Sequence, residues 1–145
     1  FHTNNILKLM AQLNFHNQPS VMIKEKEAYQ LWLILRKNFP KTERFGLGQK
    51  IDSLFIDILE LSFVSLYLPP EQKIVILSKT ISRLDLLKFF SQIAWENKLI
   101  PNEKFIELSQ KLDEIGRMLG GWKKGLQSKT PDKQAGEKQQ LRGEK

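Results

Sequence analysis

The chain has 145 residues, 41% of them hydrophobic, which is enough to form the core of one domain and fits two only with difficulty. It has no cysteine, and its two histidines, His2 and His16, lie near the N-terminus. This composition excludes disulfides and thiolate metal sites, and beyond residue 16 it excludes catalysis by Ser-His-Asp or Cys-His groups. We therefore expect no metal, no cofactor and no enzymatic activity. The net charge of +7 permits a polyanionic partner.

The basic charge is uneven along the chain. Residues 123–145 carry seven basic and three acidic side chains and almost no large apolar ones, so we expect 125–145 to be a disordered basic tail. Solubility and loose RNA binding explain such a tail equally well. We expect residues 1–21 to be a flexible extension and residues 22–124 to be the folded bundle. No signal peptide and no membrane span are visible, so we expect a cytoplasmic protein without a membrane partner.

The first predicted helix spans about residues 24–38, and Pro40 ends it because proline disfavours helical backbone in the residue before it. Its apolar stripe consists of Ala28, Trp32, Leu35 and Phe39.

The second predicted helix spans about residues 42–66, with Thr42 as its N-cap. Its main stripe has the spacing of an a/d heptad and consists of Leu47, Ile51, Leu54, Ile58, Leu61 and Ser65. A second stripe beside it consists of Phe55, Leu59, Phe63 and Leu66. Because a bundle core needs only one stripe, the wider apolar face indicates either a deeply buried helix or a surface that meets another subunit.

The third predicted helix begins at Pro69 and Pro70 and runs to about Lys98, where a cation suits the helix dipole. Its stripe consists of Ile74, Leu77, Ile81, Leu84, Leu87, Phe90, Ile93 and Ala94. The fourth follows Pro101 and is predicted to run to about Trp122, with Gly120 and Gly121 marking its end. Its stripe consists of Phe105, Leu108, Leu112, Ile115, Leu119 and Trp122. Four helices with short connections predict an all-α fold, an antiparallel up-down-up-down four-helix bundle.

Two short motifs suggest chemistry but favour plainer interpretations. Gly46-Leu47-Gly48 is similar to the start of a phosphate-binding loop, yet it lacks the third glycine, the preceding strand and the GK[ST] ending. A frayed or tightly packed helix start is the better interpretation. Asp57 and Glu60 lie three residues apart, and a solvated or salt-bridged helix face is favoured over acid–base chemistry.

The basic side chains of the body gather in two places. Residues 36–50 carry five basic side chains and one acidic one, and Lys41, Arg44 and Lys50 are among the five. Lys79 and Arg83 lie one turn apart on the third helix, with Lys88 further along on a different face. A hydrated helix surface explains these residues if they act singly. On an oligomer, the same residues would line a groove for nucleic acid.

Gly116 is the most unusual residue of the fourth helix. It lies in mid-helix, where glycine costs roughly 1 kcal/mol relative to alanine. We infer a close packing contact with another helix at Gly116, with Gly120 one turn later on the same strip. Trp122 is expected to anchor the end of the core.

Residues 113–124, DEIGRMLGGWKK, resemble the C-terminal signature of the accessory variability determinant (Avd) proteins of diversity-generating retroelements. Residues 39–52, 55–61 and 84–90 resemble segments of the same family, and the matches extend from about residue 29 to 124. Residues 39–52 are less specific, since they also resemble four-helix-bundle proteins encoded in ribosomal-RNA intervening sequences. The 113–124 string separates the two families.

The resemblance implies a four-helix bundle that assembles as a homopentamer with a basic surface. It implies a non-catalytic subunit that binds the element's reverse transcriptase and its template RNA or cDNA, and supports mutagenic retrohoming without a small-molecule substrate. The candidate contacts with nucleic acid or reverse transcriptase are Lys41, Arg44, Lys50, Lys79, Arg83, Lys88 and Arg117, and the candidates for helix packing are Gly116, Gly120 and Trp122.

Three positions differ from the family pattern or have another partner within the chain, and one other function is open. The family usually has a basic residue in place of Gln92 and often has arginine in place of Lys88. Arg117 has an alternative partner in Asp113, four residues earlier. The rival function is a structural four-helix-bundle scaffold with only nonspecific nucleic-acid binding.

Overall fold

The structure is a computed structural model, and it describes residues 19–129. The expectations for residues 1–18 and 130–145 lie outside this range. All regular structure within it is helical: α2 (Ser20–Leu35), η2 (Arg36–Asn38), α3 (Lys41–Arg44), α4 (Leu47–Ser65), α5 (Pro70–Glu96) and α6 (Asn102–Ser128). The predicted all-α fold is confirmed.

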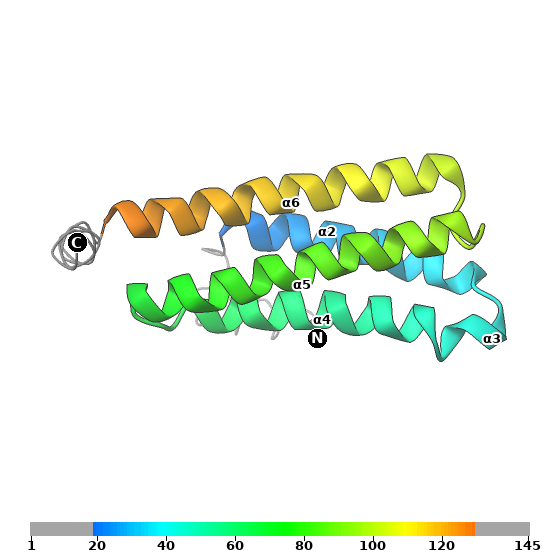
Figure 1. The fold of residues 1–145 in the computed structure, drawn as a ribbon, viewed down its shortest axis with the longest axis horizontal. Helices are drawn as coiled ribbons and strands as arrows, with labels where there is room; N and C mark the ends of the chain where they lie inside the picture. Colours follow the sequence, from blue (N-terminus) through cyan, green and yellow to red (C-terminus); the bar gives the residue numbers. More distant parts are fainter. Residues whose placement is uncertain (1–18, 130–145) are drawn as a thin grey trace, which may run out of the picture.

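The four long helices form a bundle around one core (Figure 1). Contacts join α2 to α4, α4 to α5, α5 to α6, and α6 back to α2, so each helix touches two neighbours. The sequence colours run in opposite directions along successive helices (Figure 1). This arrangement is consistent with the predicted up-down-up-down topology. No helix in residues 19–129 has both the length and the apolar character that a membrane crossing requires.

The predicted stripes supply most of the core. The fully buried side chains that they contribute include Trp32, Phe39, Ile51, Leu54, Leu77, Leu84, Leu87, Leu108, Leu112, Ile115 and Leu119. On α4, Leu47 and Leu61 are only partly buried. The second stripe of α4 is divided: Phe55 packs against Trp32 of α2, with ring centroids 6.3 Å apart, whereas Phe63 is exposed. The wide apolar face of α4 therefore packs on α2 at Phe55, whereas Phe63 contacts Tyr67 and is partly open to solvent.

The prediction of one continuous second helix over about residues 42–66 is wrong, because the structure has two helices there, α3 and α4. The backbone of Gly46 leaves the helical region, at φ −104° and ψ −101°, and separates α3 from α4. Thr42 lies inside α3, and Pro40 occupies the N-cap position instead. Gly48 then lets the first turn of α4 approach α3, because a Cβ at Gly48 would lie 3.2 Å from the Glu43 carbonyl oxygen.

The ends of α5 and α6 also differ from the prediction. Lys98 lies beyond α5, with φ of 62°, and the amide of Leu99 donates to the Ala94 carbonyl over 2.8 Å. These two features form a Schellman cap with lysine in place of the usual glycine. Gly120 and Gly121 do not end α6, which continues to Ser128. Trp122 and Leu126 extend its stripe against the core, and their packing offsets the low helix propensity of glycine.

Candidate nucleic-acid interface

The seven predicted contact residues lie on three different surfaces of the bundle. Lys50, Lys79 and Arg83 follow the seam between α4 and α5. Lys88 and Arg117 belong to the α5–α6 side, and Lys41 and Arg44 belong to the junction between α2 and α4. The three surfaces differ in how far their charges are already neutralised.

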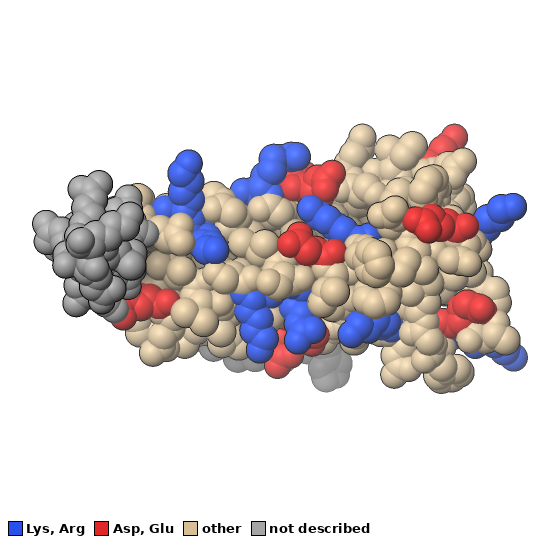
Figure 2. All heavy atoms as spheres, in the orientation of Figure 1, with Lys and Arg blue, Asp and Glu red and all other residues tan. Residues whose placement is uncertain are grey.

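The seam is a row of cations from two helices. Lys50 Nζ lies 5.8 Å from the ring centroid of Phe90, which places this α4 lysine against α5. On α5, Arg83 precedes Phe90 by two helical turns, and Lys79 precedes Arg83 by one turn. Lys79, Arg83 and Phe90 therefore share the face of α5 that lies toward α4. Figure 2 shows a row of blue side chains over α4 and α5. Within residues 19–129, none of the three cations forms an ion pair.

The α5–α6 surface is partly neutralised. Lys88 Nζ lies 3.2 Å from Asp113 Oδ1, so Asp113 pairs with Lys88 instead of with Arg117, the partner that the sequence spacing suggests. Arg117 is exposed and forms no ion pair among the described residues. The Lys88 ammonium is held across the two helices, which leaves it less free for an external phosphate than the seam cations.

The helix-packing candidates differ from one another. A Cβ at Gly116 would lie 3.3 Å from Leu84 Cδ2 and 3.4 Å from Lys88 Nζ, so α6 passes close to α5 at this glycine. At Gly120, nothing in the described chain lies within 4 Å of such an atom. Trp122 is half-buried against the core.

At the junction, Arg44 is tied to the chain that precedes α3. Its Nε donates to the Phe39 carbonyl over 3.1 Å and its Nη2 donates to the Lys37 carbonyl over 3.5 Å. Lys41, by contrast, is exposed and forms no ion pair in the described range. Arg44 thus stabilises the turn between η2 and α3 and has donors left for a ligand.

Asp52 closes the junction from the α4 side. Its Oδ1 accepts hydrogen bonds from Arg36 Nη1 at 2.7 Å, from Trp32 Nε1 at 3.2 Å and from Tyr29 Oη at 3.2 Å. Burial, followed by the nearby Asp52 charge, raises the pKa of Tyr29 above its usual value. One carboxylate thereby joins two residues of α2 and one of η2 to α4, an arrangement that residue spacing alone does not reveal.

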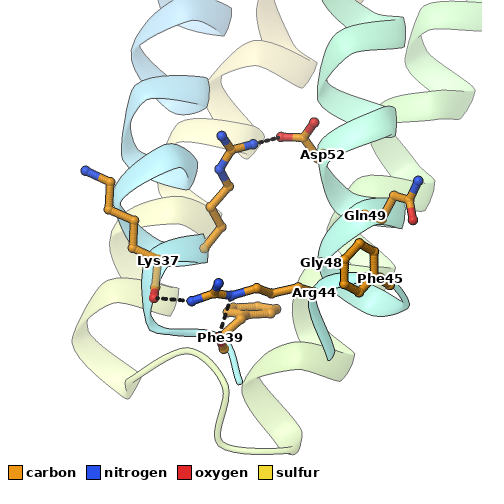
Figure 3. Close-up of a pocket in the computed structure, with 8 residues that line it drawn as sticks. Lys37, Phe39, Arg44, Phe45, Gly48, Gln49 and Asp52 are labelled. Atoms are coloured by element: carbon orange, nitrogen blue, oxygen red, sulfur yellow. Dashed lines mark hydrogen bonds and ion pairs between the residues drawn. The ribbon is translucent and has the colours of Figure 1, made fainter. Parts of the chain in front are cut away.

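Between these groups lies a pocket of about 430 Å³. Its lining consists of Arg36, Lys37, Phe39, Arg44, Phe45, Gly48, Gln49 and Asp52. Lys37 and Phe45 stand on opposite sides of the opening, and Arg44 lies across its base beside Phe39 (Figure 3). The sequence pattern indicates the basic charge of this segment but not the exposed ring of Phe45.

The buried carboxyl of Glu25 is a second feature that sequence reasoning missed. Glu25 lies on the apolar face of α2, where Ala28 and Trp32 follow it at helical spacing, and only 1% of it is exposed. Its Oε2 accepts a hydrogen bond of 2.7 Å from Ser62 Oγ, and its Oε1 has no partner among the described residues. Burial, partly countered by this hydrogen bond, raises the pKa of Glu25 to about 8. The signal in the sequence is an acid within an otherwise apolar stripe.

The described residues contain no cluster of three or more His, Asp or Glu side chains that is suited to hold a metal ion. Among known families, a family model described as bAvd-like matches residues 21–126. No curated protein matches the chain.

Proposed function

Because the chain belongs to the bAvd-like family, we propose that it binds the reverse transcriptase and the template RNA of a diversity-generating retroelement. Family membership supports the coarser role, that of an accessory protein of such an element. The match over residues 21–126 is the observation that carries this role, and it includes the DEIGRMLGGWKK string. The same membership supports a non-catalytic subunit.

The α4–α5 seam supports RNA binding. Lys50, Lys79 and Arg83 present three positive charges along one side of the bundle without ion-pair partners in residues 19–129. Unpaired cations in a row can replace the counterions of a phosphate backbone, and they need no base-specific contact to do so. We assign the main RNA contact to this seam, with Lys88 and Arg117 as secondary positions.

An exposed apolar stripe on α5 supports a protein partner. Leu86 and Phe89 lie one turn apart, Val75 lies about three turns earlier on the same side, and all three are exposed in the single chain. Exposed apolar side chains that gather on one face of a helix are a mark of a protein interface. We assign this face to the reverse transcriptase or to a second copy in the proposed homopentamer. Light scattering of the purified protein gives the number of subunits directly.

A pair of matched variants tests RNA binding by the seam. Lys79→Ala combined with Arg83→Ala should weaken binding to the template RNA and leave the helical circular dichroism unchanged. The control, Lys104→Ala combined with Lys111→Ala, removes the same charge from α6 and should bind almost as wild type does. Equal affinities for the two double variants would contradict a role for the seam.

The rival function, a scaffold with only nonspecific nucleic-acid binding, makes a different prediction. A retroelement accessory protein should be encoded beside a reverse-transcriptase gene and two near-identical repeats that differ at adenines. It should also co-purify with that reverse transcriptase. The absence of both the gene and the complex would favour the scaffold.

A further inference from the structure

The pocket at the α2–α4 junction has one wall that the core does not require. Phe45 is 84% exposed, although phenylalanine usually lies in the interior. It stands between α3 and α4, where Gly46 breaks the helix, and its ring lies beside the opening (Figure 3). Burial does not explain this ring, but a flat ligand that stacks on it would.

The base of the pocket supplies positive charge. A guanidinium has five N–H groups, and Arg44 uses two of them on the Phe39 and Lys37 carbonyls, so three remain. Those two bonds also fix the direction of the guanidinium, so little entropy is lost when it binds an anion. Lys37 also lines the pocket, but its side chain extends outward from the rim, away from Arg44 (Figure 3).

Acceptor and donor groups complete the lining. Asp52 Oδ1 is occupied by donors from α2 and η2, and Oδ2 accepts no hydrogen bond from the described residues. Gln49 also lines the pocket, but its amide extends away from Asp52 (Figure 3). The Phe45 ring, the Arg44 guanidinium and the free Asp52 Oδ2 match three features of a nucleotide: the face of its base, its phosphate and the donor groups on the edge of its base.

We propose that this pocket holds one unpaired base of a single-stranded RNA, stacked on Phe45, with the adjacent phosphate bound by Arg44. Proteins that bind single strands combine an aromatic platform with a positively charged groove in this way. An acidic peptide is disfavoured, because its carboxylates would leave the Phe45 ring unused. The inference rests on the proposed function and adds to it a preference for unpaired RNA.

Fluorescence anisotropy with the full chain and a short single-stranded RNA tests the pocket. Phe45→Ala should lower the affinity by about fivefold or more, the loss expected for one stacked base. Phe45→Trp should retain the affinity. The matched control is Tyr67→Ala, which removes a ring that is 68% exposed at the opposite end of α4 and should leave the affinity unchanged.

Two altered RNAs separate stacking from charge. On a strand with abasic sites, wild type and Phe45→Ala should bind equally, because no base is present to stack. With 2-aminopurine in the strand, wild type should change the fluorescence and Phe45→Ala should not. Because Phe45 is exposed, the variant should keep the melting temperature of wild type, which shows that any loss of binding is local.

Three results would overturn the inference, and they are distinguishable. If Phe45→Ala binds as wild type does while the Lys79 and Arg83 double variant is weakened, the pocket assignment fails and the proposed function stands. If Phe45→Ala loses only the reverse transcriptase, the pocket is a protein site. If wild type binds no RNA at physiological salt, the pocket and the RNA-binding function fail together.

Discussion

Ser62 Oγ donates a hydrogen bond of 2.7 Å to Glu25 Oε2 in the interior of the bundle. The other oxygen of this carboxyl has no partner in the described chain. The side chains around Glu25 are apolar and come from the other three long helices: Phe55, Ile58, Leu59, Leu84, Leu87, Leu112 and Ile115. An ionised carboxylate is unfavourable in such surroundings, so Glu25 is mainly a neutral acid at pH 7.

Glu25→Gln should remove a pH dependence of stability. The pKa of Glu25 is about 8 in the folded state and 4.5 when unfolded, so between these values the folded protein binds more protons than the unfolded chain. The free energy of unfolding should therefore fall as pH rises through this window, at most by about 1.4 kcal/mol per pH unit. Calorimetry from pH 5 to 8.5 should show a falling melting temperature for wild type and a flatter one for Glu25→Gln. Parallel curves would contradict the assignment.

Asp52→Ala should destabilise the bundle by about 1–3 kcal/mol, because the fully buried Trp32 loses the acceptor of its indole N–H. Arg36 loses its ion pair in the same variant. Urea unfolding measures the change. Asp85→Ala is the control, since it removes an exposed carboxylate and should change stability by no more than about 0.5 kcal/mol. Equal stabilities of the two variants would show that Asp52 does not hold α2 to α4.

Gly116→Leu should destabilise the bundle, whereas Gly120→Leu should not. A Cβ at Gly116 would lie 3.3 Å from Leu84, so a larger side chain should cost about 1–3 kcal/mol through overpacking. At Gly120 the described chain leaves open space, so leucine should be neutral or stabilise α6 by up to about 1 kcal/mol. Thermal melts of the two variants decide this. A Gly116→Leu variant as stable as wild type would show that α5 and α6 separate easily.

The salt dependence of RNA binding should report how many phosphates the seam neutralises. On a single strand, each neutralised phosphate adds about 0.7 to the slope of log K against log salt, so removal of Lys79 and Arg83 should make that slope shallower by about 1.4. Titrations between low and physiological salt measure both slopes. An unchanged slope in the double variant would place the phosphates elsewhere.

The core was predictable because its signal is local. Ala28, Trp32, Leu35 and Phe39 recur at helical spacing, and burial of one face requires only that spacing. The ends of the elements were less predictable. Glycine is a stop signal for helices, yet beyond Gly120 the apolar stripe continues to Leu126, and its burial outweighs the propensity of one residue.

The site was less predictable than the core, because it depends on how the helices are rotated against one another. The pairing of Lys88 with Asp113, rather than Arg117 with Asp113, joins two helices and cannot be deduced from spacing within one. The division of the cations among three surfaces has the same origin. Glu25 is hidden from a periodicity of apolar residues, because an acid adds nothing to that periodicity even when it lies in the core.

The seam also has a kinetic consequence. Its charges act over several ångströms of solvent, so they attract and orient a polyanion before the two molecules touch. Short-range interactions, such as a base on Phe45, form only afterwards and determine how long the complex lasts. Removal of Lys79 and Arg83 should therefore slow association, and removal of Phe45 should hasten dissociation. The bundle would then capture RNA with one surface and retain it with another.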